Sequence, residues 1–145
     1  MTAESRLDAV RRHIAKDAFA RFLGATVEIP KPGCSRVTLT VTKEMVNFHG
    51  ITHGGLIFTL GDIAFAAAGN SYGQTAVALN VNICFLKASV IGDCLVAEAR
   101  EVHAGGRTAL YEIQVYNQRT GDLLATSQDL VYRKKEWFVA PETEK

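Results

Sequence analysis

The segment that most constrains this chain is residues 53–71, HGGLIFTLGDIAFAAAGNS. It has the length of a helix, contains no proline and is rich in alanine, a strong helix former. At 100° per residue, two sets of side chains gather on opposite sides: Leu56, Ile57, Leu60, Ala64 and Ala67 on one, and Phe58, Thr59, Asp62, Phe65 and Ala66 on the other. Because apolar residues surround this helix, we expect it to be central and buried.

The segments before and after this helix are predicted to form strands that cover it. Val37, Leu39 and Val41 alternate with polar residues, the period of a strand with one buried face. Segments 77–86, 95–102, 108–117 and 123–132 also read as strands, separated by glycine-containing pairs at 92–93, 105–106 and 121–122. Short turns join antiparallel neighbours. We therefore predict an α+β fold in which a curved antiparallel sheet wraps around one long central helix.

The two ends of the chain complete the layout. Residues 6–23 carry apolar side chains at spacings of three and four, which predicts an amphipathic helix within an N-terminal segment 1–23. A short extended run follows around Val27 and Ile29. Residues 134–145 are expected to be a tail, disordered over 140–145. A length of 145 residues fits one domain, so we predict a single domain over 1–145.

Charge and cysteine content exclude several classes of function. Sixteen basic and fifteen acidic residues give a net charge of +1, which argues against a nucleic-acid partner. Three cysteines without C-x-x-C spacing, and histidines without a second ligand nearby, predict neither a disulfide framework nor a metal site. The most apolar window, residues 56–68, is too short to span a membrane and contains Asp62. We expect a soluble, cytoplasmic protein.

The chemistry is concentrated at the start of the central helix, in the run NFHGITHGG over residues 47–55. The amides of Gly54 and Gly55 are unshielded at a helix N-terminus, where N–H groups and the helix dipole favour negative charge, so they can hold an oxyanion. Alternatively, the two glycines only permit close packing there, while His53 and Asn47 cap or satisfy the loop.

Asp62 is the second feature, because burial of an unpaired carboxylate costs several kcal/mol unless the group is satisfied or useful. The alternative is a paired structural carboxylate. Eight residues separate Gly54 from Asp62, or about 12 Å along a helix, too far for both to touch one reacting carbonyl. We therefore predict an obligate dimer in which the helix start of one subunit and the Asp62 of the other share each active site.

Asn47, Gly50, His53, Gly54, Gly55 and Asp62 together resemble the signature of the hotdog-fold acyl-CoA thioesterases of the phenylacetate-degradation type. With the strand order included, the resemblance covers about residues 22–133. It implies a long helix wrapped by an antiparallel sheet and dimers whose sheets join edge to edge, often paired into tetramers. It also implies hydrolysis of acyl-CoA without a metal or other cofactor, with CoA as part of the substrate.

The resemblance also implies residue roles. The Gly54 amide polarises the thioester carbonyl, and His53 and Asn47 orient that end of the site. Asp62 of the other chain either activates water or attacks the carbonyl. Some relatives carry Ser or Thr on the next strand to hold the water, where this chain has Ala78. Asn80 or Asn82, two and four residues on and expected on the same face, can replace it or can belong to the dimer interface.

Substrate-binding residues are predicted around the same end. With Gly55, the acyl pocket would be lined by Phe48, Phe58, Phe65 and Ala66, although aromatics at this spacing also suit a core. A preference for aryl-acetyl or medium-chain acyl groups rests on the resemblance. Basic residues are expected at the CoA phosphates unless they are ordinary surface charges: Lys87, Arg107, Arg133, Lys134 and Lys135.

Three other functions fit the sequence less well. A hotdog dehydratase or hydratase needs a histidine a few residues after the aspartate, and none lies between Asp62 and His103. A non-catalytic acyl-CoA sensor usually carries a fused regulatory segment, for which the 22-residue N-terminal stretch is short. A purely structural hotdog subunit would have no reason to keep Asp62 in an apolar helix.

Overall fold

The apolar helix expected at the centre is α3 (Gly54–Gly69) in the computed structural model, which describes residues 2–141. Ten of its sixteen residues are buried. Leu60, Ala64 and Ala68 are fully enclosed by side chains from the surrounding strands. Its polar positions, including Asp62, lie on the less covered side. The prediction of a central, buried helix is confirmed.

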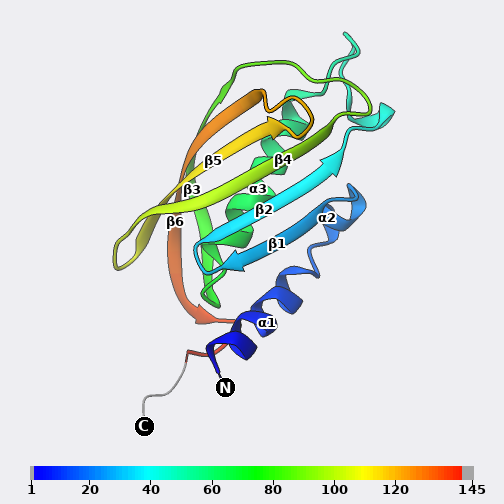
Figure 1. Cartoon of the computed structure of the whole chain (residues 1–145). Coiled ribbons are helices and arrows are strands. Elements are labelled where there is room, and N and C mark those ends of the chain that lie inside the picture. Colours follow the sequence, from blue (N-terminus) through cyan, green and yellow to red (C-terminus); the bar gives the residue numbers. More distant parts are fainter. Residues whose placement is uncertain (1, 142–145) are drawn as a thin grey trace.

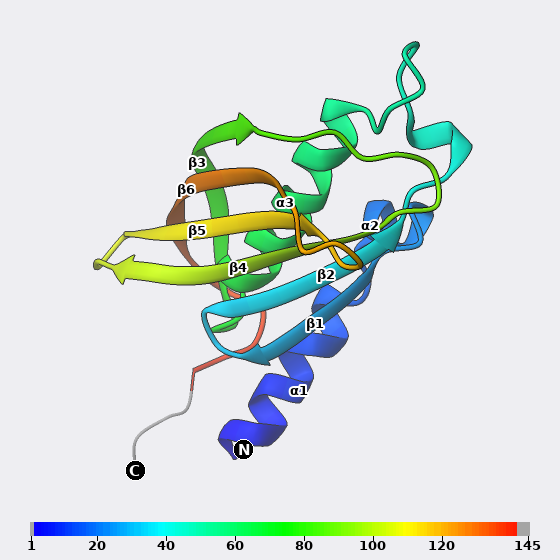
Figure 2. The same ribbon diagram turned by 45° about the horizontal axis from the view of Figure 1, so that its top comes forward.

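Six antiparallel strands curve around α3 in one sheet, in the order β1-β2-β4-β5-β6-β3 (Figure 1). Their bounds are β1 (Thr26–Lys31), β2 (Cys34–Thr40), β3 (Gln74–Phe85), β4 (Cys94–Ala104), β5 (Thr108–Asn117) and β6 (Leu123–Trp137). A short 3₁₀ turn, η1 (Lys43–Met45), follows β2. The predicted α+β class and wrapped sheet are confirmed, with β1 and β3 as the two edges of the sheet (Figure 2).

The N-terminal segment differs from the single helix predicted over residues 6–23. It forms two helices, α1 (Ala3–Ile14) and α2 (Ala18–Phe22), outside β1 (Figure 1). The break is stabilised by Asp17, whose carboxylate accepts a hydrogen bond from the Ala20 amide at 3.0 Å and caps α2. The apolar spacing continues across this break, which is why the sequence pattern predicted one helix.

The C-terminal segment also differs from its prediction, because β6 continues five residues beyond the expected end at Tyr132, to Trp137. Gln74 and Trp137 are paired, so the start of β3 provides the partner for this extension. Of the expected disordered tail, Ala140 accepts a hydrogen bond from Arg6 Nε at 3.0 Å, and residues 142–145 lie outside the described range.

Strand β3 contains a β-bulge. Ala78 pairs with Val131, whereas Asn80 pairs with Leu130, so Leu79 is an extra residue. Residues directly opposite each other project to the same face of a sheet. Beyond the bulge, Val81 and Ile83 face α3 together with the inward side chains of β6, and Asn80 and Asn82 face outward. The prediction that Asn80 and Asn82 share a face with Ala78 is therefore wrong, because the bulge shifts the alternation by one residue.

Candidate active site

The loop before α3 is shaped by Asn47. Its side-chain oxygen accepts hydrogen bonds from the amides of His49 at 2.9 Å and Ile51 at 3.4 Å. Gly50 adopts a φ of 79°, which L side chains rarely adopt, and its amide donates to the Asn47 carbonyl at 2.9 Å. Asn47 thus closes the turn that delivers the chain to the start of the helix.

His53 is the N-cap of α3, and its Nδ1 accepts a hydrogen bond from the Gly55 amide at 2.8 Å. Of the two amides expected to be unshielded, that of Gly55 is therefore occupied. The Gly54 amide donates no hydrogen bond to any atom within residues 2–141. One N–H group at the positive end of a sixteen-residue helix is thus free to bind an oxyanion. His53 caps the helix and Asn47 satisfies the loop, as the alternative interpretation predicts. These contacts leave the Gly54 amide free to bind a ligand.

An aromatic side chain lies beside Gly54. A Cβ atom added to Gly54 would lie 3.7 Å from the ring of Phe85, the last residue of β3. Phe48, from the preceding loop, is 92% exposed, and Phe58 on α3 is also exposed. Sequence reasoning missed Phe85, because only the register of β3 brings the end of that strand to the start of α3. The helix start therefore offers a hydrogen-bond donor next to the ring of Phe85.

Asp62 is half-buried on α3, two turns beyond Gly54. Burial raises the pKa of its carboxyl, and the negative charge of Asp17 raises it further. Within residues 2–141 its carboxylate forms no ion pair and no hydrogen bond. Asp62 is therefore not a paired structural carboxylate within one chain, and its raised pKa makes it a stronger base than an ordinary aspartate.

Asp62 faces a small cavity of about 10 Å³ between α3 and the sheet. Phe58, Val81 and Ile83 contribute apolar walls, and Ser127 and Asp129 line it from β6. Asp129 is 1% exposed and accepts a hydrogen bond from the Ser127 hydroxyl. Burial raises its pKa to about 6; the Ser127 hydrogen bond lowers the pKa and the charge of Asp62 raises it. Sequence reasoning missed both residues of β6.

The remaining predicted residues are dispersed. Phe65 is buried in the core with its ring 5.8 Å from that of Tyr111, so in one chain it is a core residue and not a pocket wall. Ala66 is exposed, one turn beyond Asp62 on α3. Lys87 follows β3 and pairs with Asp122 at 2.9 Å. Arg107 lies in the β4–β5 turn at the other end of the sheet (Figure 1), and its Nη1 donates to the Tyr132 hydroxyl at 3.2 Å.

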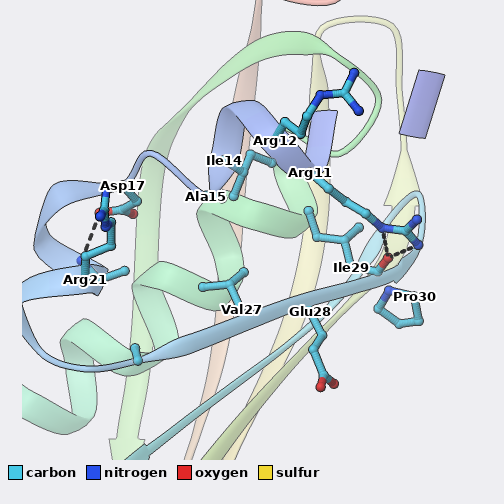
Figure 3. A pocket seen from close by; sticks show the side chains of 12 residues that line it. Arg11, Arg12, Ile14, Ala15, Asp17, Arg21, Val27, Glu28, Ile29 and Pro30 are labelled. Atoms are coloured by element: carbon cyan, nitrogen blue, oxygen red, sulfur yellow. Dashed lines mark hydrogen bonds between the residues drawn. The ribbon is translucent and has the colours of Figure 1, made fainter. Parts of the chain in front are cut away.

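A larger pocket of about 690 Å³ lies elsewhere, between the N-terminal helices and β1 (Figure 3). Its wall includes Val27, Ile29 and the guanidinium group of Arg11, which donates to the Ile29 carbonyl at 2.7 and 3.0 Å (Figure 3). None of the residues in the 47–62 motif lines this pocket. Within residues 2–141, no three His, Cys, Asp or Glu side chains are placed to hold a metal ion, and no helix is long and apolar enough to cross a membrane.

Comparison with known proteins agrees with this geometry. The model of the Thioesterase superfamily matches residues 49–123, the segment from the motif loop to the start of β6. Acyl-coenzyme A thioesterase PaaI of Escherichia coli K12 is 44% identical over 103 residues, which are 71% of this chain and 74% of that protein.

Solved structures agree as well. The E. coli PaaI protein, from the phenylacetic acid degradation operon, superposes with a TM-score of 0.87 and 34% identity, over 94% of this chain and 99% of that one. A Streptococcus mutans UA159 protein bound to acetyl CoA has a TM-score of 0.72 and 31% identity, over 76% of this chain and 88% of that one. The chain belongs to the Thioesterase superfamily and has the hotdog fold of its PaaI-type members.

Proposed function

We propose that this protein hydrolyses acyl-CoA thioesters to a free acid and CoA, and that its substrates carry aryl-acetyl or medium-chain acyl groups. The observation that carries the proposal is the pairing, on one helix, of a free amide at Gly54 with an unpaired, half-buried carboxylate at Asp62. Membership of the Thioesterase superfamily and the likeness to an acyl-CoA thioesterase support it.

The residues suit one reaction sequence. Asp62 takes a proton from water as the water oxygen bonds to the thioester carbonyl carbon, and the carbonyl oxygen becomes an oxyanion that accepts a hydrogen bond from the Gly54 amide. The C–S bond then breaks, the carbonyl re-forms, and the CoA thiolate leaves and receives the proton from Asp62. The products are a carboxylic acid and CoA. The cavity beside Asp62 has room for about one water, which favours this route over direct attack by the carboxylate.

A complete site requires two chains. Gly54 and Asp62 are separated by about 12 Å along α3, and a single chain therefore cannot bring both to one carbonyl. The edge strand β3 exposes Val77, Leu79 and Phe85, an apolar edge of the kind that proteins cover by association. We infer a homodimer joined through β3, with further pairing into a tetramer.

Exposed aromatic side chains near the start of α3 support the proposed preference for aryl-acetyl or medium-chain acyl groups. Phe85 lies beside Gly54, and Phe85, Phe48 in the preceding loop and Phe58 on α3 are exposed, so they can pack against a ring or an alkyl chain. Of the predicted phosphate-binding residues, Lys87 lies closest along the chain to this end of β3, and we assign it the CoA phosphates. The three free cysteines suit a reducing compartment, in keeping with the cytoplasm.

The decisive experiment measures thiol release from short-chain, medium-chain, long-chain and aryl-acetyl-CoA by the native protein and by Asp62→Asn. We expect cleavage of aryl-acetyl or medium-chain substrates, and a loss of about a hundredfold or more in kcat/KM for the variant. Size-exclusion elution and thermal melting serve as controls for assembly and fold. Binding of acyl-CoA without cleavage by the native protein would instead identify a sensor or carrier.

A further inference from the structure

A second carboxylate shares the cavity of Asp62. Asp129 points inward from β6, opposite Val81 on β3, and lines the same small cavity between α3 and the sheet. Its Oδ1 is held by the Ser127 hydroxyl. No cation lies within 4 Å of either carboxylate in the part of the chain that the structure describes. The family motif at residues 47–62 does not include Asp129, and the proposed reaction sequence does not use Asp129.

We propose that Asp129, oriented by Ser127, is a positioning residue that sets the basicity of Asp62 across their shared cavity. The proposal rests on the proposed function, in which Asp62 is the base. It assigns Asp129 no contact with the substrate. Its effect on the reaction passes through the carboxylate on α3.

The physical reason is repulsion between like charges in apolar surroundings. The rest of the cavity wall is mostly apolar, and no cation compensates a second negative charge, so one of the two carboxyls retains its proton more tightly. Asp129, the more buried one, has a pKa of about 6. Once Asp129 ionises, its charge acts back on Asp62 and strengthens the attraction of that carboxylate for a proton. Asp62 is therefore a stronger base above pH 6 than below it.

The charged groups that face this pair are few. Asp17, the N-cap of α2, acts on Asp62 with its negative charge, and Asp62 acts in the same way on Asp129. Strand β3 contributes Val81 and Ile83, and β5 contributes Ile113 and Val115, none of which titrates. Among residues 2–141, Ser127 is the neighbour that favours the ionised form of Asp129, through its hydrogen bond.

The test is the pH profile of kcat/KM between pH 4.5 and 9 for the native protein, Asp129→Asn and Ser127→Ala. We expect a rise of about two- to fivefold near pH 6 in the native protein and no such step in Asp129→Asn. Below pH 5 the two should have equal activity, because Asp129 is then neutral. Ser127→Ala should move the step to higher pH, because the ionised form of Asp129 loses a hydrogen bond.

Glu101→Gln is the matched control. Glu101 is a half-buried carboxylate on β4 that accepts hydrogen bonds from the Tyr72 hydroxyl at 2.6 Å and the Tyr111 hydroxyl at 3.2 Å, outside the cavity. Its replacement should leave the step near pH 6 in place. Loss of the step in this control, or retention of an unchanged step in Asp129→Asn, would overturn the proposal.

A readout that needs no activity separates the two proposals. Carboxyl ¹³C titration should show Asp129 titrating about one unit lower in Asp62→Asn than in the native protein. An unchanged titration would overturn the coupling even if the protein cleaves thioesters. If no thioester is cleaved and the titration does shift, the proposed function fails while the coupling between the carboxylates stands. If Asp129→Asn does not fold, Ser127→Ala and this titration decide the matter.

Discussion

At the scale of single residues, Asp129 shows what burial of a carboxyl does to stability. Its pKa is about 6 in the folded protein, against an ordinary value of 3.8, so the folded chain binds this proton more tightly than the unfolded chain does. The contribution of the group to stability is complete below about pH 4. It is lost as the pH rises through 6. Because asparagine cannot ionise, an Asp129→Asn variant does not lose this stability as the pH rises.

Asp129→Asn should therefore raise the free energy of unfolding by roughly 3 kcal/mol at pH 8 and change it little at pH 4. Urea unfolding at the two pH values measures the difference. Because the native protein loses the stability between pH 4 and pH 6, the gap between the two proteins should open over that window. A gap of equal size at both pH values would show that packing, and not ionisation, separates them.

The sequence predicted one of the two carboxylates for a clear reason. Asp62 interrupts a helix that is apolar on every side, which marks it as unusual. Asp129 lies in the strand segment LLATSQDLVY, where apolar and polar residues occur on both faces. Two-residue alternation there does not decide which face is buried, so only the pairing with β3 shows that Asp129 points inward.

At the scale of elements, the two amides at the start of α3 have different roles. His53 satisfies the Gly55 amide, and the Gly54 amide stays free among the atoms of residues 2–141. Gly54 is the first helical residue, a position that accepts proline, and the ψ of 135° at His53 suits a residue before proline. Proline at 54 would thus remove the free N–H while keeping the helix.

Gly54→Pro should lower kcat/KM by about a hundredfold or more, the usual cost of losing one oxyanion donor. Gly54→Ala keeps the N–H group, and its Cβ atom would meet Phe85 at an ordinary contact distance of 3.7 Å, so its activity should stay within about tenfold of the native protein. Steady-state kinetics with thermal melting of both variants measures this. Equal losses in the two variants would point to crowding at residue 54 instead of a missing donor.

The elements themselves were largely predictable, and the exceptions have local causes. The central helix and the strands follow from apolar periodicity, which the structure confirms. The break between α1 and α2 was missed because Ile14, Ala18 and Phe22 keep their spacing across it. Asp17 was the available signal, since an aspartate is a strong N-cap and the capped amide lies three residues further on.

At the scale of the whole molecule, the proposed site belongs to a pair of chains, and this can be tested by mixing two inactive proteins. Asp62→Asn keeps the Gly54 amide, and Gly54→Pro keeps the carboxylate. In a mixed dimer with shared sites, one site would contain both native groups and the other would contain neither.

Mixing equal amounts of the two variants under exchange conditions should restore about a quarter of native activity, since half the dimers are mixed and each has one working site. Thiol release after exchange measures it, with each variant alone as the control. If both groups of a site came from the same chain, mixing would restore nothing.

The bulge at Leu79 affects how residue roles pass from one relative to another. An ungapped alignment assumes that residues an even number of columns apart lie on the same face of a strand. This assumption fails at residue 79. Ala78 lies before the change of face, and Asn80 and Asn82 lie after it. A relative without the bulge needs a one-residue gap at this point. Without that gap, every later column of β3 would be compared with side chains from the opposite side of the sheet.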